Sequence, residues 1–588
     1  MKILAVVFAV AAIYASCFAG QTQTAAPGEY IIENDVAIPM RDGVVLRADV
    51  LRPKGRGPFP VLVYRTPYGK EDALKDYTTF RRAVERGYAV VVQDVRGRYA
   101  SAGEFTAYKQ ESHDGYDTIE WAAAQPWSNG AVGTFGLSYP GAVQWLAAIE
   151  NPPHLKAMVP AMTFSTPQNF FYAGGTWDMS WIDWIWNNIA PDIRVKKNLP
   201  GPRTVEEAGA AWKSMADAMY RELPLSSLRE LQGVAPYYYE WLRHPVDDPW
   251  WDWCELRNKY GRVQAAVLNL SAWYDDNYGP EGATTNFAGL LKAREATDLA
   301  RPHLLLGPWV HGVGSTSKTR SGEREFGAAA AIDYDEVVLR WLDHYVRGVE
   351  NGVDGEKAVR YFVMGANAWR EADSWPPAAN PQSYYLLPVQ PENGKAGTLS
   401  PSANDRPGYG AFTSDPRDPV LNRYPSGAHD YRDLVKRKDV LTFDSAALAR
   451  DMEVTGPIRA EVFLSCDCRD LDLWVHLIDV APDGTAFNLM SPGLNVLRTS
   501  YRDMKGGRQL LQPGEVYRLR LDNLITSNVF QKGHRIRVQI SASFFPNFSR
   551  NLQNGNLEAT SGESLPATIR IYDGRGHASR IVLPVVNP

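Results

Sequence analysis

A serine in a glycine-rich turn is the first residue whose setting could do chemistry. The turn Gly136-Leu137-Ser138-Tyr139-Pro140-Gly141 follows residues 131–135, which have the apolar pattern of a buried strand, and precedes the helical pattern of residues 143–149. A serine held between a strand and a helix, with small neighbours, exposes its hydroxyl on a strained turn as a nucleophile. The alternative is an ordinary strand-to-helix loop, because this motif alone has low specificity.

A nucleophilic serine needs a histidine to take its proton and a carboxylate to orient that histidine. In a hydrolase sheet the three residues follow in the order Ser, Asp, His, each in a loop just past a strand end. Asp275 follows the apolar segment 265–270, and His311 follows the segment 303–306. The sequence therefore predicts Ser138, His311 and Asp275 as a catalytic triad. Asp276 is the competing candidate for the acid.

Acyl transfer also needs hydrogen-bond donors for the oxyanion of its tetrahedral intermediate. The backbone N–H of Tyr139, directly after the serine, is predicted as one donor. The second donor is expected in the loop after an early strand, where residues 64–70 contain no glycine-rich run. We therefore expect the Tyr68 hydroxyl to be the second donor. The alternative is a tyrosine that only packs beneath the site.

The length, charge and N-terminus limit the class of protein. A chain of 588 residues predicts two to four structural units, and a formal net charge of -5 gives no basis for a nucleic-acid partner. Residues 1–19 have the charged start, apolar stretch and small-residue cleavage site of a secretory signal peptide, so we expect export to the periplasm or the medium and no membrane span. The alternatives are a buried first helix and lipid attachment at Cys17.

The remaining cysteines are Cys254, Cys466 and Cys468. Two residues that are two positions apart in a strand point the same way but are too far apart for an easy bridge. We therefore interpret Cys466 and Cys468 as core or loop cysteines. A metal site needs more ligands than this pair supplies nearby, so we expect neither a metal nor a cofactor.

The order of predicted elements divides the mature chain into parts. Strands and helices alternate over residues 28–165 and again over 259–378, and the unbroken apolar strands indicate a mainly parallel sheet covered on both faces. Residues 166–258 interrupt this alternation and are helical and rich in tryptophan, as a cap domain would be. Residues 382–588 show short alternating segments and turns, which are typical of a β-sandwich.

Tryptophans of the predicted cap are candidates for a substrate pocket. Trp177, Trp181 and Trp184 have the spacing of one helix face. Such spacing is common in any buried helix, so a packing surface is one interpretation. The other is the roof of a pocket, because insertions at the carboxyl ends of strands often cover a ligand crevice. We assign Trp177, Trp181 and Trp273 to the pocket.

A set of short motifs resembles the cocaine-esterase-like family of serine hydrolases, which is related to X-Pro dipeptidyl-peptidases and α-amino acid ester hydrolases. The motifs are Arg65-Thr66-Pro67-Tyr68, Asp94-Val95-Arg96-Gly97-Arg98, Gln125-Pro126-Trp127-Ser128, Gly136 to Gly141, Trp273-Tyr274-Asp275, Gly307-Pro308-Trp309-Val310-His311 and Gly533-His534-Arg535-Ile536-Arg537. The resemblance implies an α/β-hydrolase fold with an inserted helical cap and a C-terminal jelly-roll β-sandwich. It also implies Ser138 as nucleophile, Asp275 as acid, His311 as base, and Tyr68 with the Tyr139 amide as oxyanion hole.

The substrate class is the least specified feature. The α-amino acid ester hydrolases that the chain resembles carry acidic residues two and three places after the catalytic aspartate, to hold the substrate ammonium. Here these places are Asn277 and Tyr278. This argues against an α-amino ester or a dipeptide substrate, unless another carboxylate supplies the charge. The candidates for that carboxylate are Asp276, Glu281, Asp178 and Asp183.

We therefore expect an exported serine hydrolase that acts on an ester or amide of a small molecule or short peptide. An X-Pro dipeptidyl-peptidase and an α-amino acid ester hydrolase are the alternative enzymes. From another class, a catalytically inactive protein that binds partners through the jelly-roll surface is the remaining alternative.

Overall fold

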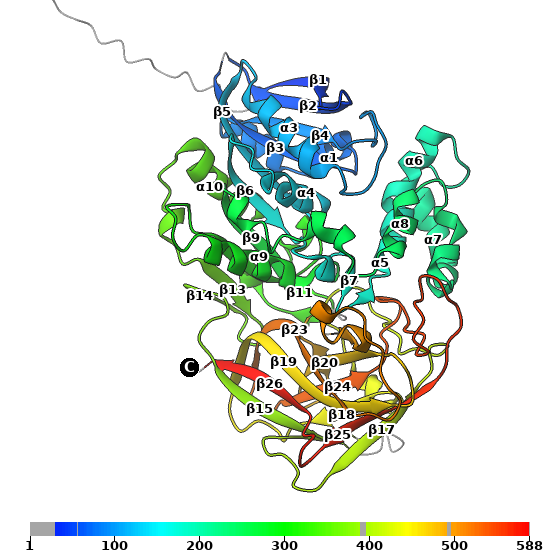
Figure 1. Cartoon of the computed structure of the whole chain (residues 1–588). Helices are drawn as coiled ribbons and strands as arrows, with labels where there is room; N and C mark the ends of the chain where they lie inside the picture. Colours follow the sequence, from blue (N-terminus) through cyan, green and yellow to red (C-terminus); the bar gives the residue numbers. More distant parts are fainter. Residues whose placement is uncertain (1–29, 56, 389–395, 491–495, 587–588) are drawn as a thin grey trace, which may run out of the picture.

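A computed structural model describes residues 30–55, 57–388, 396–490 and 496–586 of the protein. Figure 1 shows three parts: an α/β unit, a group of helices beside it, and a strand-rich unit that contains the C-terminus. The helical group is inserted between two strands of the α/β unit. The candidate catalytic residues all belong to the α/β unit.

The α/β unit is built on one sheet with the strand order β1-β2-β4-β3-β5-β6-β9-β10-β13-β14. Its strands are β1 (Tyr30–Pro39), β2 (Val45–Pro53), β3 (Phe59–Thr66), β4 (Ala89–Asp94), β5 (Ser128–Leu137), β6 (Leu155–Ala161), β9 (Ala266–Tyr274), β10 (His303–Val310), β13 (Val359–Val363) and β14 (Ala368–Ala372). The run from β4 to β13 is parallel, and the strands at the two ends pair antiparallel. Every residue of β4 and β9 is buried, as expected for parallel strands covered on both faces.

Helices cover both faces of this sheet. They are α1 (Lys70–Asp76), α2 (Thr79–Glu85), α3 (Glu111–Ala123), α4 (Tyr139–Ala148), α9 (Gly279–Ala293) and α10 (Tyr334–Arg347). α3 and α4 share a core with one set of alternating strand residues, such as Val61 and Val63, and α2 and α10 share a core with the other set. Alternate residues of a strand point to opposite faces, so the two helix pairs lie on opposite sides. Within the described ranges, no helix combines the length and apolarity needed to cross a bilayer.

The inserted helical group lies between β6 and β9. Its helices are α5 (Ser180–Trp184), α6 (Ala190–Lys197), α7 (Val205–Arg221) and α8 (Pro236–Arg243). The prediction that Trp177 shares a helix face with Trp181 and Trp184 is wrong, because Trp177 lies in the short strand β8 (Thr176–Trp177). The preceding Gly174 and Gly175 both have positive φ. This conformation, which glycine adopts readily, turns the chain back into a hairpin before the helix starts.

The C-terminal unit consists of strands that pair largely antiparallel. They are β15 (Asn380–Leu387), β16 (Gly397–Ser400), β17 (Gly408–Ser414), β18 (Leu441–Asp444), β19 (Met452–Cys466), β20 (Asp472–Val480), β21 (Ala486–Asn488), β22 (Val496–Arg498), β23 (Tyr517–Phe530), β24 (Arg535–Ser541), β25 (Ala567–Asp573) and β26 (Arg580–Val586). Burial alternates along β25 and β26, which is the pattern of a sandwich with one face on the core. The predicted α/β-hydrolase fold with a helical cap and a C-terminal β-sandwich is confirmed.

The interpretation of Cys466 and Cys468 as unpaired cysteines is wrong. The two residues form a disulfide with their Cα atoms 5.3 Å apart, and Cys254 is free and buried. The expectation assumed that both cysteines lie in one extended strand. β19 ends at Cys466, and the chain bends at once, so the geometry of an extended strand does not apply to this pair.

Close packing of α4 on the neighbouring strand gives a testable expectation. A Cβ atom at Gly141 would lie 2.6 Å from the backbone oxygen of Ala161 in β6, so we expect Gly141→Ala to lower the free energy of unfolding by about 1–3 kcal/mol. The matched control is Gly209→Ala in α7, where a Cβ atom meets nothing within 4 Å. There we expect a gain of up to about 1 kcal/mol from helix propensity. Urea unfolding measures both, and equal effects would contradict the packing argument.

Candidate active site

Ser138 occupies a strained turn between β5 and α4. Its backbone has φ 69° and ψ -126°, a combination that is costly for any residue with a side chain. The turn is fixed because the Ser138 N–H donates to the Ala161 carbonyl at 3.0 Å, while the Ser138 carbonyl accepts from the N–H groups of Gly141 and Ala142 at 2.9 Å. The side chain is thereby held at the start of a helix, at the carboxyl edge of the sheet. This is the geometry of a nucleophile elbow.

His311 and Asp275 lie at the ends of the adjacent parallel strands β10 and β9. The His311 Nδ1 atom is 2.9 Å from Asp275 Oδ1, and the Asp275 side chain is fully buried. Asp275 Oδ1 also accepts from the N–H groups of Asn277 at 3.1 Å and Tyr278 at 3.4 Å. Burial alone would lower the pKa of His311, but the charge and hydrogen bond of Asp275 outweigh it, and the pKa is raised above 6.5.

The competing acid Asp276 points elsewhere. Its Oδ2 atom accepts a hydrogen bond from the Ser426 hydroxyl of the β-sandwich. Burial raises the pKa of Asp276, and the hydrogen bond from Ser426 acts in the opposite direction. The histidine is therefore bonded to Asp275 and not to Asp276.

Tyr68 and Tyr278 flank the serine. Both tyrosines line the same pocket as Ser138, and the Ser138 side chain acts against the burial that raises the pKa of each tyrosine. The Trp184 indole N–H donates to the Tyr68 oxygen at 3.0 Å, so the Tyr68 proton is directed away from Trp184. Burial raises the pKa of Tyr68 to about 12, which keeps its hydroxyl protonated and able to donate.

Two arginines of the sequence motifs, Arg65 and Arg98, are buried behind the serine, and their bonding partners account for their presence there. The Tyr139 hydroxyl donates to Glu111 at 2.7 Å, and Glu111 pairs with Arg65 at 2.7 Å. Arg98 is fully buried and donates to the backbone oxygens of Pro67 at 2.8 Å and Ile189 at 2.7 Å. Because Pro67 precedes Tyr68 and Ile189 belongs to the cap, Arg98 fixes the cap next to the tyrosine loop.

Ser138 and His311 line one pocket of about 300 Å³. Trp181 and Trp184 of the cap also line it, but Trp177 and Trp273 do not. The assignment of these last two to the pocket is therefore wrong. Trp177 packs within the cap against Tyr172 and Trp241. Trp273 is fully buried and donates to the Phe362 backbone oxygen at 2.8 Å, since it points from β9 into the core rather than along the strand end.

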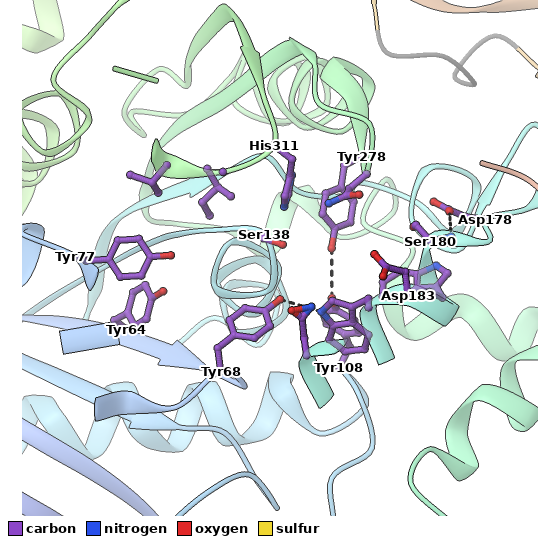
Figure 2. Close-up of a pocket in the computed structure, with 17 residues that line it drawn as sticks. Tyr64, Tyr68, Tyr77, Tyr108, Ser138, Asp178, Ser180, Asp183, Tyr278 and His311 are labelled. Atoms are coloured by element: carbon purple, nitrogen blue, oxygen red, sulfur yellow. Dashed lines mark hydrogen bonds between the residues drawn. The ribbon is translucent and has the colours of Figure 1, made fainter. Parts of the chain in front are cut away.

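The pocket extends to both sides of the serine. Figure 2 shows Ser138 and His311 in the middle, Tyr64 and Tyr77 on one side, and Asp178 and Asp183 of the cap on the other. Burial raises the pKa of Asp178 to about 7, and burial also raises the pKa of Asp183. Of the described residues that line this pocket, none is a lysine or an arginine. One end is therefore aromatic and the other is acidic.

Sequence reasoning did not assign Trp184 or Tyr278 a role beside the serine. Trp184 was visible as a member of the tryptophan pattern, and Tyr278 as a departure from the acidic residue of related enzymes. Of the four alternative carboxylates, Asp178 and Asp183 line the pocket. Glu281 lines a separate cleft with Arg257 and Asp522.

The fold and the pocket define a hydrolase of the α/β type with a C-terminal β-sandwich. The sequence matches the family models described as X-Pro dipeptidyl-peptidase (S15 family) over residues 42–313 and X-Pro dipeptidyl-peptidase C-terminal non-catalytic domain over residues 351–582. Cocaine esterase of Rhodococcus sp. (strain MB1 Bresler) is 34% identical over 95% of this chain and 99% of its own length. The chain therefore belongs to the cocaine-esterase-like family, which confirms the resemblance and supports an enzyme rather than an inactive binding protein.

Solved structures agree on the fold. An aminopeptidase from the marine sediment archaeon Thaumarchaeota archaeon has a TM-score of 0.80 at 24% identity, covering 95% of this chain and 97% of its own. An α-amino acid ester hydrolase has a TM-score of 0.80 at 24% identity, covering 97% of this chain and 99% of its own. At this identity the likeness establishes the fold.

The hydrogen bond from Trp184 to Tyr68 gives a testable expectation. In Trp184→Phe the Tyr68 hydroxyl loses its fixed orientation beside Ser138, so we expect kcat for aryl-ester hydrolysis to fall roughly two- to tenfold, the worth of one neutral hydrogen bond. The matched control is Trp181→Phe, because the Trp181 indole N–H, in the same pocket, is buried and has no hydrogen-bond partner among the described residues. An equal fall of kcat in both variants would contradict a specific role of this bond.

Proposed function

We propose that the protein is a serine hydrolase that cleaves an ester or amide through an acyl-enzyme on Ser138. The observation that carries this proposal is the His311–Asp275 hydrogen bond of 2.9 Å at the pocket that also contains the strained Ser138 turn. A histidine whose Nδ1 is held by a buried carboxylate presents its Nε2 to a serine as a base. The family supports the same chemistry.

The reaction follows from these positions. His311 Nε2 accepts the Ser138 proton as the serine oxygen attacks the substrate carbonyl, and Asp275 stabilises the resulting imidazolium. The Tyr68 hydroxyl and the Tyr139 N–H, one of the free N–H groups of the first turn of α4, donate to the oxyanion. The histidine proton then passes to the leaving alcohol or amine. A water molecule, deprotonated by the same histidine, releases the acid and restores the serine.

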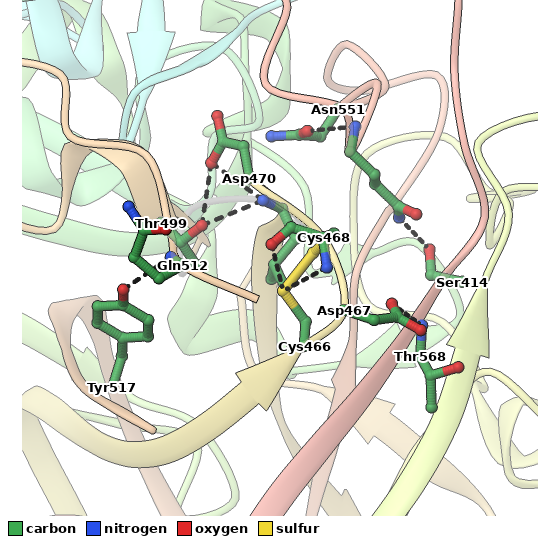
Figure 3. Close-up of a disulfide and its surroundings, with 12 residues drawn as sticks. Ser414, Cys466, Asp467, Cys468, Asp470, Thr499, Gln512, Tyr517, Asn551 and Thr568 are labelled. Atoms are coloured by element: carbon green, nitrogen blue, oxygen red, sulfur yellow. Dashed lines mark hydrogen bonds between the residues drawn. A yellow bond between two sulfur atoms is a disulfide. The ribbon is translucent and has the colours of Figure 1, made fainter. Parts of the chain in front are cut away.

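Export is part of this proposal. The predicted signal peptide of residues 1–19 and the alternative lipid site at Cys17 lie outside the described residues. The disulfide between Cys466 and Cys468, shown in Figure 3, supports an oxidising compartment, because disulfides persist mainly outside the cytosol. Fractionation of the native host would place an unexported protein with the cytosolic markers.

The nucleophile and the base can be tested together. A fluorophosphonate probe is expected to label the wild type and to fail on Ser138→Ala. Only neutral His311 can accept the serine proton, and its pKa is raised above 6.5. We therefore expect kcat/KM for an aryl ester to be lost as the pH falls through a midpoint above 6.5. A folded but unlabelled wild type, or activity independent of pH below 6.5, would count against the proposal.

A second candidate substrate carries a positive charge near the scissile bond. Asp178 and Asp183 line the acidic end of the pocket, where the described lining residues offer no lysine or arginine as a counter-ion. Buried carboxylates favour a partner of opposite charge. A substrate ammonium would meet this need, so an amino-acyl ester or an X-Pro peptide is the alternative to a neutral acyl ester.

A substrate panel separates these candidates. If the substrate is cationic, we expect kcat/KM to be higher for an aryl ester with a free amino group than for its N-acetyl derivative. Asp178→Asn or Asp183→Asn should then reduce the ratio of these two kcat/KM values roughly 10- to 100-fold, which is the worth of a charged hydrogen bond. Glu281→Gln, which alters a different cleft, is the matched control. Faster turnover of a Gly-Pro anilide than of either ester would favour the dipeptidyl-peptidase. A preference for the N-acetyl ester would favour the neutral substrate.

A further inference from the structure

The loop that carries Asp275 is bonded to the β-sandwich as well as to the hydrolase core. Asp275 and Asp276 are consecutive, and their side chains have different partners: Asp275 bonds His311, and Asp276 accepts from the Ser426 hydroxyl. Ser426 lies 150 positions further along the chain. One side of this loop therefore faces the pocket and the other meets the sandwich.

The residue before Asp275 makes a second bond to the sandwich. The Tyr274 hydroxyl donates to the backbone oxygen of Asn488, in β21, at 3.0 Å. The Asn488 side chain in turn accepts from the His429 N–H at 2.7 Å and donates to the Gly427 oxygen at 3.0 Å. Asn488 thus links the strand end that carries the acid to the segment 426–429 that contains Ser426.

The segment 426–429 is also hydrogen-bonded to the chain that follows His311. The Glu323 N–H donates to the Ala428 oxygen at 2.8 Å, in the hairpin of β11 (Arg320–Ser321) and β12 (Arg324–Glu325). The Ser321 hydroxyl donates to the backbone oxygen of Pro308 in β10. The hairpin thereby connects the segment 426–429 to the strand that ends beside His311.

Two glycines allow this close contact. A Cβ atom at Gly322 would lie 2.4 Å from the Ala428 oxygen, and one at Gly427 would lie 2.6 Å from the Gly322 nitrogen. Both glycines have positive φ, 58° and 126° respectively, where side chains are strained. The hairpin and the segment 426–429 therefore meet backbone to backbone, and their spacing is fixed.

We propose that the segment 426–429 of the β-sandwich positions the catalytic pair, with Ser426 acting through Asp276 on the acid loop and Ala428 acting on the hairpin that bonds β10, the strand that ends next to His311. Ser426 and Asp276 are positioning residues, since neither lines the pocket. This inference rests on the proposed roles of Asp275 and His311. It gives the domain that the family model describes as non-catalytic a part in catalysis.

The charges around His311 predict a change in the pH dependence of kcat/KM that a loss of packing alone would not produce. Burial lowers the pKa of His311, and the charges of Asp275 and Asp276 raise it. The Tyr278 ring also lies close to the His311 ring, with centroids 5.8 Å apart. The Ser426 hydroxyl favours the charged form of Asp276. Loss of that hydroxyl or of the Asp276 charge therefore lowers the pKa of His311, and the acid limb of kcat/KM moves to lower pH.

The test compares Ser426→Ala, Ser426→Thr, Asp276→Asn and the control Ser465→Ala, whose hydroxyl bonds Tyr572 within the sandwich at 2.9 Å. The readouts are the pH profile of kcat/KM for an aryl ester, the rate of fluorophosphonate labelling, and the melting temperature. We expect Ser426→Ala to lower kcat/KM roughly five- to tenfold and to shift the acid limb downward. Asp276→Asn should shift the limb further, and Ser426→Thr should restore both the rate and the limb.

Three results would decide against the inference. Wild-type rates and an unshifted limb in both Ser426→Ala and Asp276→Asn would overturn it. Equal losses in Ser426→Ala and Ser465→Ala, with unchanged limbs, would show a general effect on the sandwich and would also overturn it. An unlabelled wild type would overturn the proposed function first, and the positioning role with it.

Discussion

The hydrogen bond between His311 and Asp275 depends on the pairing of two parallel strands. β9 and β10 are adjacent and parallel, paired from Leu268 and His303 to Tyr274 and Val310 with one register shift after Gly307, so the residues that follow them emerge at the same sheet edge. The Asp275 carboxylate is fully buried and would be costly to hold there as a charge without partners. Two backbone N–H groups and the His311 ring supply partners for its Oδ1 atom. His311 and the serine turn line the same pocket.

Each part of the chain contributes one such constraint. The hydrolase core supplies the strained serine turn and the His–Asp pair, and the cap supplies Trp184, which orients the Tyr68 hydroxyl. Arg98 joins the cap to the Tyr68 loop through backbone oxygens on both sides. The sandwich shares a hydrophobic cluster with Trp273 and Tyr274, directly before the acid. Reacting groups need side chains around them that fix their positions, and these contacts supply such support from all three parts of the chain.

The sequence was informative where a feature depends on local order. The alternation of apolar strands and helices predicted the hydrolase fold, and strand ends predicted which Ser, Asp and His would meet at one edge. The predictions from sequence were wrong for features that depend on the exact position of a turn. Trp177 has helical spacing to Trp181 but lies before a glycine turn, and Cys468 lies past the end of β19. The sequence also could not reveal Ser426 beside Asp276, because no local pattern relates residues 150 positions apart that meet only when two domains pack.

The protonation of the carboxylates near the pocket depends on the charge of the bound substrate. Burial is the main cause of the raised pKa values of Asp178 and Asp183, and the charge of Asp276 adds to it. The pKa of His311 is raised mainly by Asp275, and the charge of Asp276 adds to that effect as well. Asp178, with a pKa of about 7, carries a proton for part of the time at neutral pH. A bound cation favours its charged form, so cation binding below pH 7 would release a proton from this end of the pocket, whereas a neutral acyl group would not. The same Asp276 charge favours the protonated form of His311, the proposed base, so it acts in the same direction on the titration of His311 and on that of the acidic end.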